Sequence, residues 1–209
     1  FGNTHNLQSI NFQNTKVENI TEAAFFNSSV RAVIFPTNCT IESWAFACSD
    51  ITLLDGNIRQ LGYFSFFFCH NINHISLSQD STFTDVPDHC FSHCEKLQEI
   101  SLPHNLTGIM AYAFNNCSTL KQINIQDTQL RIIGTAAFAN CTKLSGYTLP
   151  QTCTQIGDEA FMNTSIFGIE IAKEVSSIGV GAFRACTHLN SVSMSQSSIT
   201  VISNRCFAG

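Results

Sequence analysis

Hydrophobic residues recur along this chain with a period of about two dozen residues, and one phenylalanine marks each repeat. The nine phenylalanines of the series, spaced 20 to 25 residues apart, are Phe25, Phe46, Phe66, Phe91, Phe114, Phe138, Phe161, Phe183 and Phe207. Phe1, which precedes Phe25 by 24 residues, extends the same series. A fixed period of this size along the chain predicts a solenoid of stacked coils, in which each coil buries its apolar face against its neighbours.

Each unit shares further apolar positions around its phenylalanine. An aliphatic residue lies five positions before the ring and a small residue directly before it, as in Ile109, Ala113 and Phe114. After the ring come apolar residues that alternate with period two, as in Ile123 and Ile125. Alternation of this kind predicts a short half-buried strand, and such strands stack ~4.8 Å apart into a parallel sheet. We expect one sheet along one face, turns or short helices elsewhere, and the rings in the interior.

Between the two inward apolar positions of each strand lies a residue that should point away from the sheet. These residues form one stripe: Asn11, Ile34, Ser76, Ser101, Asn124, Thr148, Glu170 and Ser193. We expect this stripe to bind a ligand, because a rigid row of strands can hold many weak contacts at once. Ile34 and Phe167, which we expect to be exposed on this face, are either anchors for a partner or isolated surface hydrophobes.

Composition excludes several classes of function. Only 12% of the residues are charged, the net charge is −5 and there is no basic patch, which argues against a nucleic-acid partner. No apolar run approaches the roughly 18 residues that a membrane span needs, so any membrane attachment would need an anchor elsewhere in a parent chain. No nucleophile elbow, phosphate loop or repeated carboxylate pair is present, so we expect neither an enzyme nor a cofactor. Residues 1–209 begin and end inside repeat units, which predicts one solenoid domain truncated at both ends.

Ten cysteines follow the repeat register. Five of them lie three residues after the repeat phenylalanine: Cys69, Cys94, Cys117, Cys141 and Cys186. We expect most of the ten to be free, buried thiols, with a bridge between stacked equivalents as the alternative. His89 and His93 stand beside Cys90 and Cys94 at spacings that zinc ligands can have. In register these cysteines face inward, so we expect outward-facing surface histidines and no metal.

Seven N-x-S/T sequons are present: Asn19, Asn27, Asn38, Asn105, Asn116, Asn140 and Asn163. Four of these asparagines, at positions 27, 116, 140 and 163, share the slot two residues after the phenylalanine. They are compatible with a glycosylated ectodomain. Equally, asparagine at a turn satisfies backbone groups with its own side chain, so both interpretations stay open.

The segments IGDEAF at 156–161 and IGVGAFRAC at 178–186 resemble leucine-rich repeats of the BspA type, and the resemblance covers about nine units of the chain. It implies an α/β solenoid, wound as a right-handed coil, in a single domain. It also implies a cell-surface or secreted protein that binds host proteins, extracellular matrix or other cells. Cysteine and sequon usage favours a parasitic protist, such as a trichomonad, as the source.

Two other functions stay open beside adhesion. A structural spacer or homotypic assembly module would work through self-association, and an intracellular protein-interaction scaffold is favoured if the thiols are free and the sequons unused. Two stretches depart from the repeat: the short unit at 41–56 and the aromatic-rich segment at 64–68. We expect irregular packing there.

Overall fold

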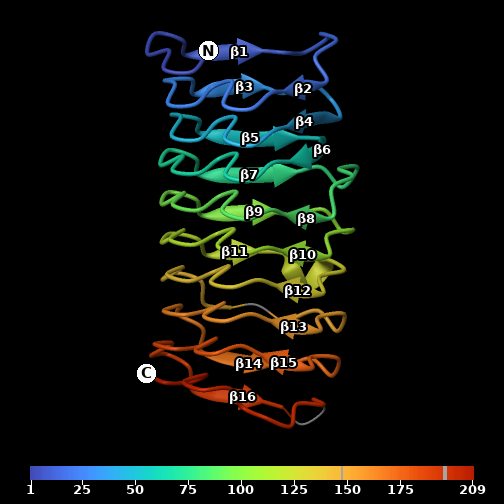
Figure 1. The fold of residues 1–209 in the computed structure, drawn as a ribbon, viewed down its shortest axis with the longest axis vertical. Coiled ribbons are helices and arrows are strands. Elements are labelled where there is room, and N and C mark those ends of the chain that lie inside the picture. Colours follow the sequence, from blue (N-terminus) through green and yellow to red (C-terminus); the bar gives the residue numbers. More distant parts are fainter. Residues whose placement is uncertain (147, 195–196) are drawn as a thin grey trace.

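The computed structural model describes residues 1–146, 148–194 and 197–209, and in it successive repeats stack as coils along one long axis. Figure 1 shows the N-terminus at one end of this stack and the C-terminus at the other. Most coils contribute short strands to two ladders, which run along two sides of the molecule.

The first ladder contains the strands that the alternating apolar residues predict. Its strands are β1 (Ser9–Asn11), β3 (Ala32–Ile34), β5 (Leu53–Gly56), β7 (His74–Leu77), β9 (Glu99–Ser101), β11 (Gln122–Ile123), β14 (Gly168–Glu170) and β16 (Ser191–Ser193). All the pairings are parallel, and equivalent residues oppose one another: Leu54 faces Ile75, which faces Ile100. The predicted parallel strands and their register are therefore confirmed, whereas the pairings among the described residues form three sets, β1-β3, β5-β7-β9-β11 and β14-β16, rather than one continuous sheet.

A second ladder lies where no sheet was expected. Its strands are β2 (Asn19–Ile20), β4 (Cys39–Ile41), β6 (Ile58–Leu61), β8 (Asp85–Val86), β10 (Gly108–Ile109), β12 (Ile132–Ile133), β13 (Gln155–Ile156) and β15 (Ser177–Ile178). Each ends at the aliphatic residue five positions before the phenylalanine. Strands as short as two residues show no alternation, which is why the sequence pattern did not reveal them.

The predicted fold class, an α/β solenoid with a sheet on one face, is thus wrong, whereas the predicted solenoid itself is confirmed. In the described part of the chain the one helical segment is a single 3-10 turn, η1 (Ile125–Asp127). The fold is a parallel β-solenoid of about eight turns with about 23 residues per turn, rather than nine α/β units.

The repeat phenylalanines form one continuous stack inside the coil, as predicted. From Phe1 to Phe207, neighbouring ring centroids lie 5.0 to 5.5 Å apart with planes within 2° to 15°. The backbone repeats with the rings, because each phenylalanine N–H donates to the carbonyl of the small residue in the next coil. Phe114 N, for example, lies 2.8 Å from Ala137 O. The turn is therefore a third column of hydrogen bonds beside the two ladders.

The turn around each phenylalanine is built from left-handed residues. The residues two before and two after the ring have positive φ in coil after coil, as at Tyr112 (57°) and Asn116 (60°) around Phe114. Asparagine tolerates this conformation better than most residues. The geometry thus accounts for the four asparagines that share the slot, whose φ angles lie between 51° and 62°.

The cysteines are free thiols, and nine of the ten are buried, as expected; Cys48 is exposed. The five in the slot three residues after the phenylalanine also act as donors. Cys117 Sγ lies 3.2 Å from Phe91 O of the preceding coil, and Cys141 Sγ lies 3.1 Å from Phe114 O. Burial raises the pKa of the Cys69, Cys94, Cys117 and Cys141 thiols, that of Cys69 to about 12. The cysteine thiols therefore donate hydrogen bonds to backbone carbonyl groups of the preceding coil, in addition to filling space in the core.

Replacing one ring of the stack should be costly. Phe114→Ala should lower the free energy of unfolding by about 3–5 kcal/mol, because it leaves a cavity between two stacked rings. Urea unfolding measures this change. Phe167→Ala, at a ring that is 57% exposed, is the control and should stay within about 0.5 kcal/mol. Equal losses in the two variants would contradict the central role of the stack.

Thiol reactivity should separate Cys48 from the other nine. A thiol reagent at pH 8 should label one cysteine of the native protein rapidly, because the other nine thiols are buried and inaccessible to the reagent. Cys48→Ser should abolish this fast phase, and all thiols should react once the chain is unfolded. A fast phase that survives in Cys48→Ser would show that the buried column is open to solvent.

Candidate binding faces of the coil

The predicted stripe on the first ladder points outward as expected. Six of its eight residues are exposed, and Ser76 and Asn124 are half-buried. Around Ser76 the residues on either side, Ile75 and Leu77, face inward and are buried, whereas Val192 beside Ser193 is exposed. Ile34 is 51% exposed and Phe167 is 57% exposed. The placement of the stripe is therefore confirmed, whereas its role in binding stays a prediction.

Four stripe residues share a groove of about 760 Å³ on this face: Ser101, Asn124, Thr148 and Glu170. We call it the first-ladder groove. They come from four successive coils, with Ser101 at the end of β9 and Glu170 at the end of β14. The other four stripe residues, Asn11, Ile34, Ser76 and Ser193, do not line it. The structure therefore concentrates the central part of the stripe into one concave surface.

The first-ladder groove combines polar and acidic side chains with apolar ones, of which Phe167 is exposed while Ile100 and Ile123 are buried. Glu99 and Glu170 contribute carboxylates, and His74 Nδ1 lies 3.9 Å from Glu99 Oε2 across β7 and β9. Phe167 adds an exposed ring. Asn124 is less available than expected, because its Nδ2 donates to Leu102 O at 3.0 Å and its Oδ1 accepts from Leu102 N at 2.7 Å. Its amide holds the neighbouring strand in place.

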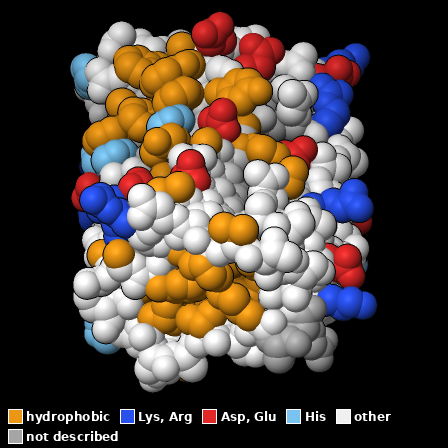
Figure 2. Space-filling model, turned by 60° about the horizontal axis from the view of Figure 1, so that its bottom comes forward, with side chains coloured by type: hydrophobic (Ala, Val, Ile, Leu, Met, Phe, Trp, Pro, Cys, Tyr) orange, Lys and Arg blue, Asp and Glu red, His pale blue; other side chains and the backbone are white. Residues whose placement is uncertain are grey.

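A second aromatic column, which the sequence pattern did not reveal, stands outside the phenylalanine stack. In four successive coils the residue two before the repeat phenylalanine is aromatic, and the rings of Trp44, Phe64, His89 and Tyr112 stack at 4.3, 4.5 and 4.7 Å. Phe67 packs edge-on against the first three of these rings. Figure 2 shows hydrophobic side chains with histidines among them in the part of the view towards the N-terminal end.

The segment at 64–68 is therefore not irregular inside the coil. Phe46 and Phe66 stack at 5.4 Å, like the other repeat rings. Its extra aromatic residues extend the packing outward instead. They do so because the left-handed residues of the turn direct their side chains along the column, where Phe64 and Phe68 have φ of 57° and 56°.

The two histidines beside the cysteine slots belong to this aromatic cluster. His89 lies between Phe64 and Tyr112, and His93 stacks on Phe68 at 4.2 Å. Both are half-buried rather than facing freely outward as predicted. Burial lowers the pKa of each, because it penalises the charged imidazolium. Among the described residues, no group of three or more His, Cys, Asp or Glu side chains could hold a metal ion.

The sequon asparagines differ in what their side chains do. Asn19, Asn27, Asn38 and Asn163 are exposed, and Asn105, Asn116 and Asn140 are half-buried. Asn27 Nδ2 donates to Asn3 Oδ1 at 2.8 Å, and Asn163 Nδ2 donates to Asn140 Oδ1 at 2.9 Å. This amide ladder supports the structural interpretation of the slot, and glycosylation stays a prediction.

Two strand ladders around a stack of rings, closed by repeated left-handed turns, define a parallel β-solenoid repeat protein. The family model of the BspA type leucine rich repeat region matches in six copies over residues 1–55, 50–132 and 109–209, and the chain belongs to this family. The family is a non-enzymatic repeat scaffold. A search of curated proteins found no match.

Three solved structures that resemble this chain are bacterial. A leucine-rich repeat protein from Bacteroides ovatus shares 24% identity at a TM-score of 0.70, over 88% of this chain and 54% of its own. A leucine rich cell surface protein from Faecalibacterium prausnitzii shares 23% at 0.64, over 95% and 49%. The pneumococcal vaccine antigen PcpA shares 18% at 0.51, over 88% and 61%. The chain spans about half the length of the first two.

These relatives establish the fold and give no support to a protist source. They include one protein described as a cell surface protein and one described as a vaccine antigen. Across the described residues of this chain, no helix has the length and apolar character that a membrane crossing requires.

Acidification should destabilise the protein through the two stacked histidines. Their folded pKa values lie below the unfolded value of about 6.5. The unfolded chain therefore takes up protons first, and stability that is present above pH 6.5 is lost as the pH falls towards the folded pKa values. Urea unfolding between pH 7.5 and 5.5 measures this loss.

A matched variant isolates the contribution of His89 and His93 to the pH dependence of stability. The double variant His89→Phe, His93→Phe should lose most of this pH dependence, since phenylalanine already occupies the equivalent left-handed slots at Phe64 and Phe68. Trp44→Phe, in the same column, should keep it. Stability that rises on acidification would mean that attraction between imidazolium and the neighbouring rings outweighs desolvation.

Proposed function

We propose that this chain is a cell-surface recognition module that binds a protein of a host, of the extracellular matrix or of another cell through the first ladder. The observation that carries the proposal is the first-ladder groove, in which Ser101, Thr148 and Glu170 of separate coils line one concavity. The cell-surface relative and the neutral polar exterior support it.

The size of the face suits a protein better than a small molecule. A stable protein interface buries about 1,200–2,000 Å² in total, more than one groove supplies. Strands spaced ~4.8 Å apart continue the stripe beyond the groove, towards Ile34 at one end and Ser193 at the other. Exposed Ile34 and Phe167 would supply the apolar contacts that dominate binding energy, and the polar stripe would fix orientation.

The acidic charge of the first-ladder groove indicates which kind of protein segment could bind there. Glu99 and Glu170 are exposed at the groove, and His74 is the one histidine beside them. A partner segment that carries lysine or arginine near an apolar residue would complement this arrangement. The attraction should weaken at high salt, since these carboxylates are exposed and screened.

The experiment is direct binding of the protein to host epithelial cells and to a panel of matrix proteins. The variant carries Ser101→Arg, Thr148→Arg and Ser193→Arg, which place long cations along the stripe. We expect saturable binding by the native chain and at least a tenfold loss in the variant, with an unchanged circular dichroism spectrum.

A matched control adds the same charge elsewhere. Gln151→Arg, Gln155→Arg and Ser177→Arg change exposed residues in or beside the second ladder and should leave binding intact. Equal losses in the two triple variants would point to a non-specific charge effect. An unaffected stripe variant would favour a structural spacer, in which no lateral face matters.

The free thiols favour one second candidate, an intracellular protein-interaction scaffold. Such a protein would use the same face on a different partner. The intact mass of native material distinguishes the two: glycans on the sequons would exclude the intracellular scaffold, and an unmodified mass would favour it.

A further inference from the structure

The second ladder is interrupted once, between β6 and β8. Its strands join as β2-β4-β6 and as β8-β10-β12-β13-β15, with no pairing between the two sets. In five other coils of the ladder the residue directly after the strand donates its N–H to the preceding coil, as Glu42 N does to Ile20 O and Met110 N to Val86 O, both at 2.9 Å. Pro87 occupies this slot in the coil of β8. Proline has no N–H, so the Leu61 carbonyl does not receive this bond.

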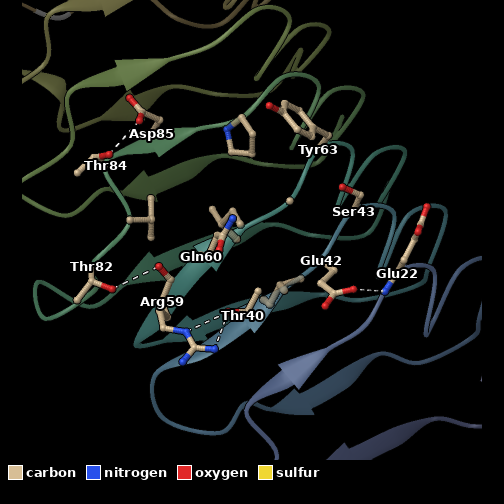
Figure 3. A pocket seen from close by; sticks show the side chains of 15 residues that line it. Glu22, Thr40, Glu42, Ser43, Arg59, Gln60, Tyr63, Thr82, Thr84 and Asp85 are labelled. Atoms are coloured by element: carbon tan, nitrogen blue, oxygen red, sulfur yellow. Dashed lines mark hydrogen bonds between the residues drawn. The ribbon is translucent and has the colours of Figure 1, made fainter.

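The interruption is confined to the outside of the coil. Inside, Phe66 and Phe91 remain stacked at 5.4 Å. At the surface, side-chain hydrogen bonds replace the missing strand pairing, from Ile58 N to Ser81 Oγ at 3.1 Å and from Thr82 Oγ1 to Arg59 O at 3.3 Å, and a groove of about 670 Å³ lies beside them. We call it the second-ladder groove; Figure 3 shows it from close by. Its volume lies in the range of about 300–1,000 Å³ that is typical of small-ligand sites.

A β-bulge places an arginine at one end of this groove. Ile58 pairs with Cys39 and Gln60 pairs with Thr40, so Arg59 is the extra residue of β6. Its Nε and Nη2 donate to Thr40 Oγ1 at 3.1 and 3.0 Å, and Nη2 also donates to Asn19 Oδ1 at 3.0 Å. Three of the five guanidinium donors are used in this way. The ion pairs among the described residues do not include Arg59, so its charge is held by neutral oxygens.

Two carboxylates on opposite walls of the second-ladder groove are likewise held by hydrogen bonds with neutral groups. Glu42 Oε2 accepts the backbone N–H of Glu22 at 2.9 Å. Asp85 accepts from the hydroxyl of Thr84 at 2.9 Å and from that of Thr107 at 3.2 Å. Each carboxylate is oriented by neutral donors and keeps further lone pairs for a ligand.

The middle of the groove is polar and one end is aromatic. Gln60 is exposed on β6, and Figure 3 shows it among the drawn residues with Arg59 on one side and Tyr63 on the other. The Tyr63 ring is 57% exposed. Leu61 and Pro87 add apolar surface to the lining.

We propose that the second-ladder groove binds a short neutral oligosaccharide. A sugar ring carries neighbouring hydroxyls that both donate and accept, together with an apolar C–H face. Arg59 supplies donors, Glu42 and Asp85 supply acceptors, and Gln60 supplies both, while Tyr63 offers a ring for the apolar face. Hydrogen bonds from neutral hydroxyls to fixed charged groups are strong without requiring an opposite charge.

The charge balance selects against acidic glycans. Glu22, Glu42 and Asp85 line the groove against the single guanidinium of Arg59. A sialylated or sulfated sugar would meet an excess of carboxylates and be repelled. This site lies on the second ladder and does not depend on the function proposed for the first.

Saturation-transfer NMR with defined sugars tests the proposal. The probes are N-acetyllactosamine, cellotriose, chitotriose and mannotriose, with 3′-sialyllactose as the acidic sugar and trilysine as the basic peptide. We expect transfer to at least one neutral sugar and at least tenfold weaker binding of 3′-sialyllactose. Gln60→Ala and Tyr63→Ala should each weaken the neutral sugar at least fivefold, whereas Thr148→Ala in the first-ladder groove should not.

Closing the groove is the second arm of the test. Pro87→Ala restores an N–H to the slot and allows β8 to pair with Leu61, so sugar binding should fall at least tenfold without a loss in the unfolding midpoint. The proposal is overturned if no neutral sugar binds, or if binding survives in Gln60→Ala and Tyr63→Ala. Binding of trilysine in place of the sugars would overturn it in favour of a basic peptide. Full sugar binding in Pro87→Ala would refute the role of the interrupted ladder.

Discussion

The column of stacked phenylalanine rings is the interaction on which the rest of this solenoid depends. Two-residue strands such as β10 and β12 cannot hold coils together by hydrogen bonds alone. The rings remove water from the interior of each coil and set the separation between coils at 5.0 to 5.5 Å. Neighbouring strands at this separation fall within pairing distance, and the phenylalanine N–H meets the carbonyl of the next coil. Strand pairing therefore follows from the stacking.

This interior constraint leaves the outer slots free to vary. The residue two before the ring must adopt a left-handed conformation, yet Ala136, Glu159, Trp44 and His89 all occupy it. Where four successive coils place aromatic rings there, a second stack forms outside the first. A repeat of this kind can change its surface chemistry coil by coil without losing its core, because the coils share only the interior slots.

The two proposed binding sites have different origins in the coil, the first in residues of successive coils that lie side by side and the second in a missing contact between two coils. The first-ladder groove needs outward residues of four successive coils to lie side by side on one face, and strand pairing joins the first two of these coils through β9 and β11. The second-ladder groove needs the opposite, a missing hydrogen bond at Pro87 while Phe66 and Phe91 stay stacked. Both proposed binding grooves depend on a core that is stable enough to tolerate local gaps at the surface.

The sequence by itself determined the coil, its interior and the outward stripe. The phenylalanine period, the cysteine slot and the direction of Ser101 or Glu170 all follow from spacing, since stacked coils place equivalent residues in one column. Only the tertiary structure decided the second ladder, the stacking of His89 between Phe64 and Tyr112, and the bulge at Arg59. Each of these depends on what the adjacent coil offers some 23 residues away, a contact that no local pattern contains. Pro87 shows the difference most clearly. The sequence gives its position, but only the structure shows that its missing N–H leaves the Leu61 carbonyl of the preceding coil without this hydrogen bond.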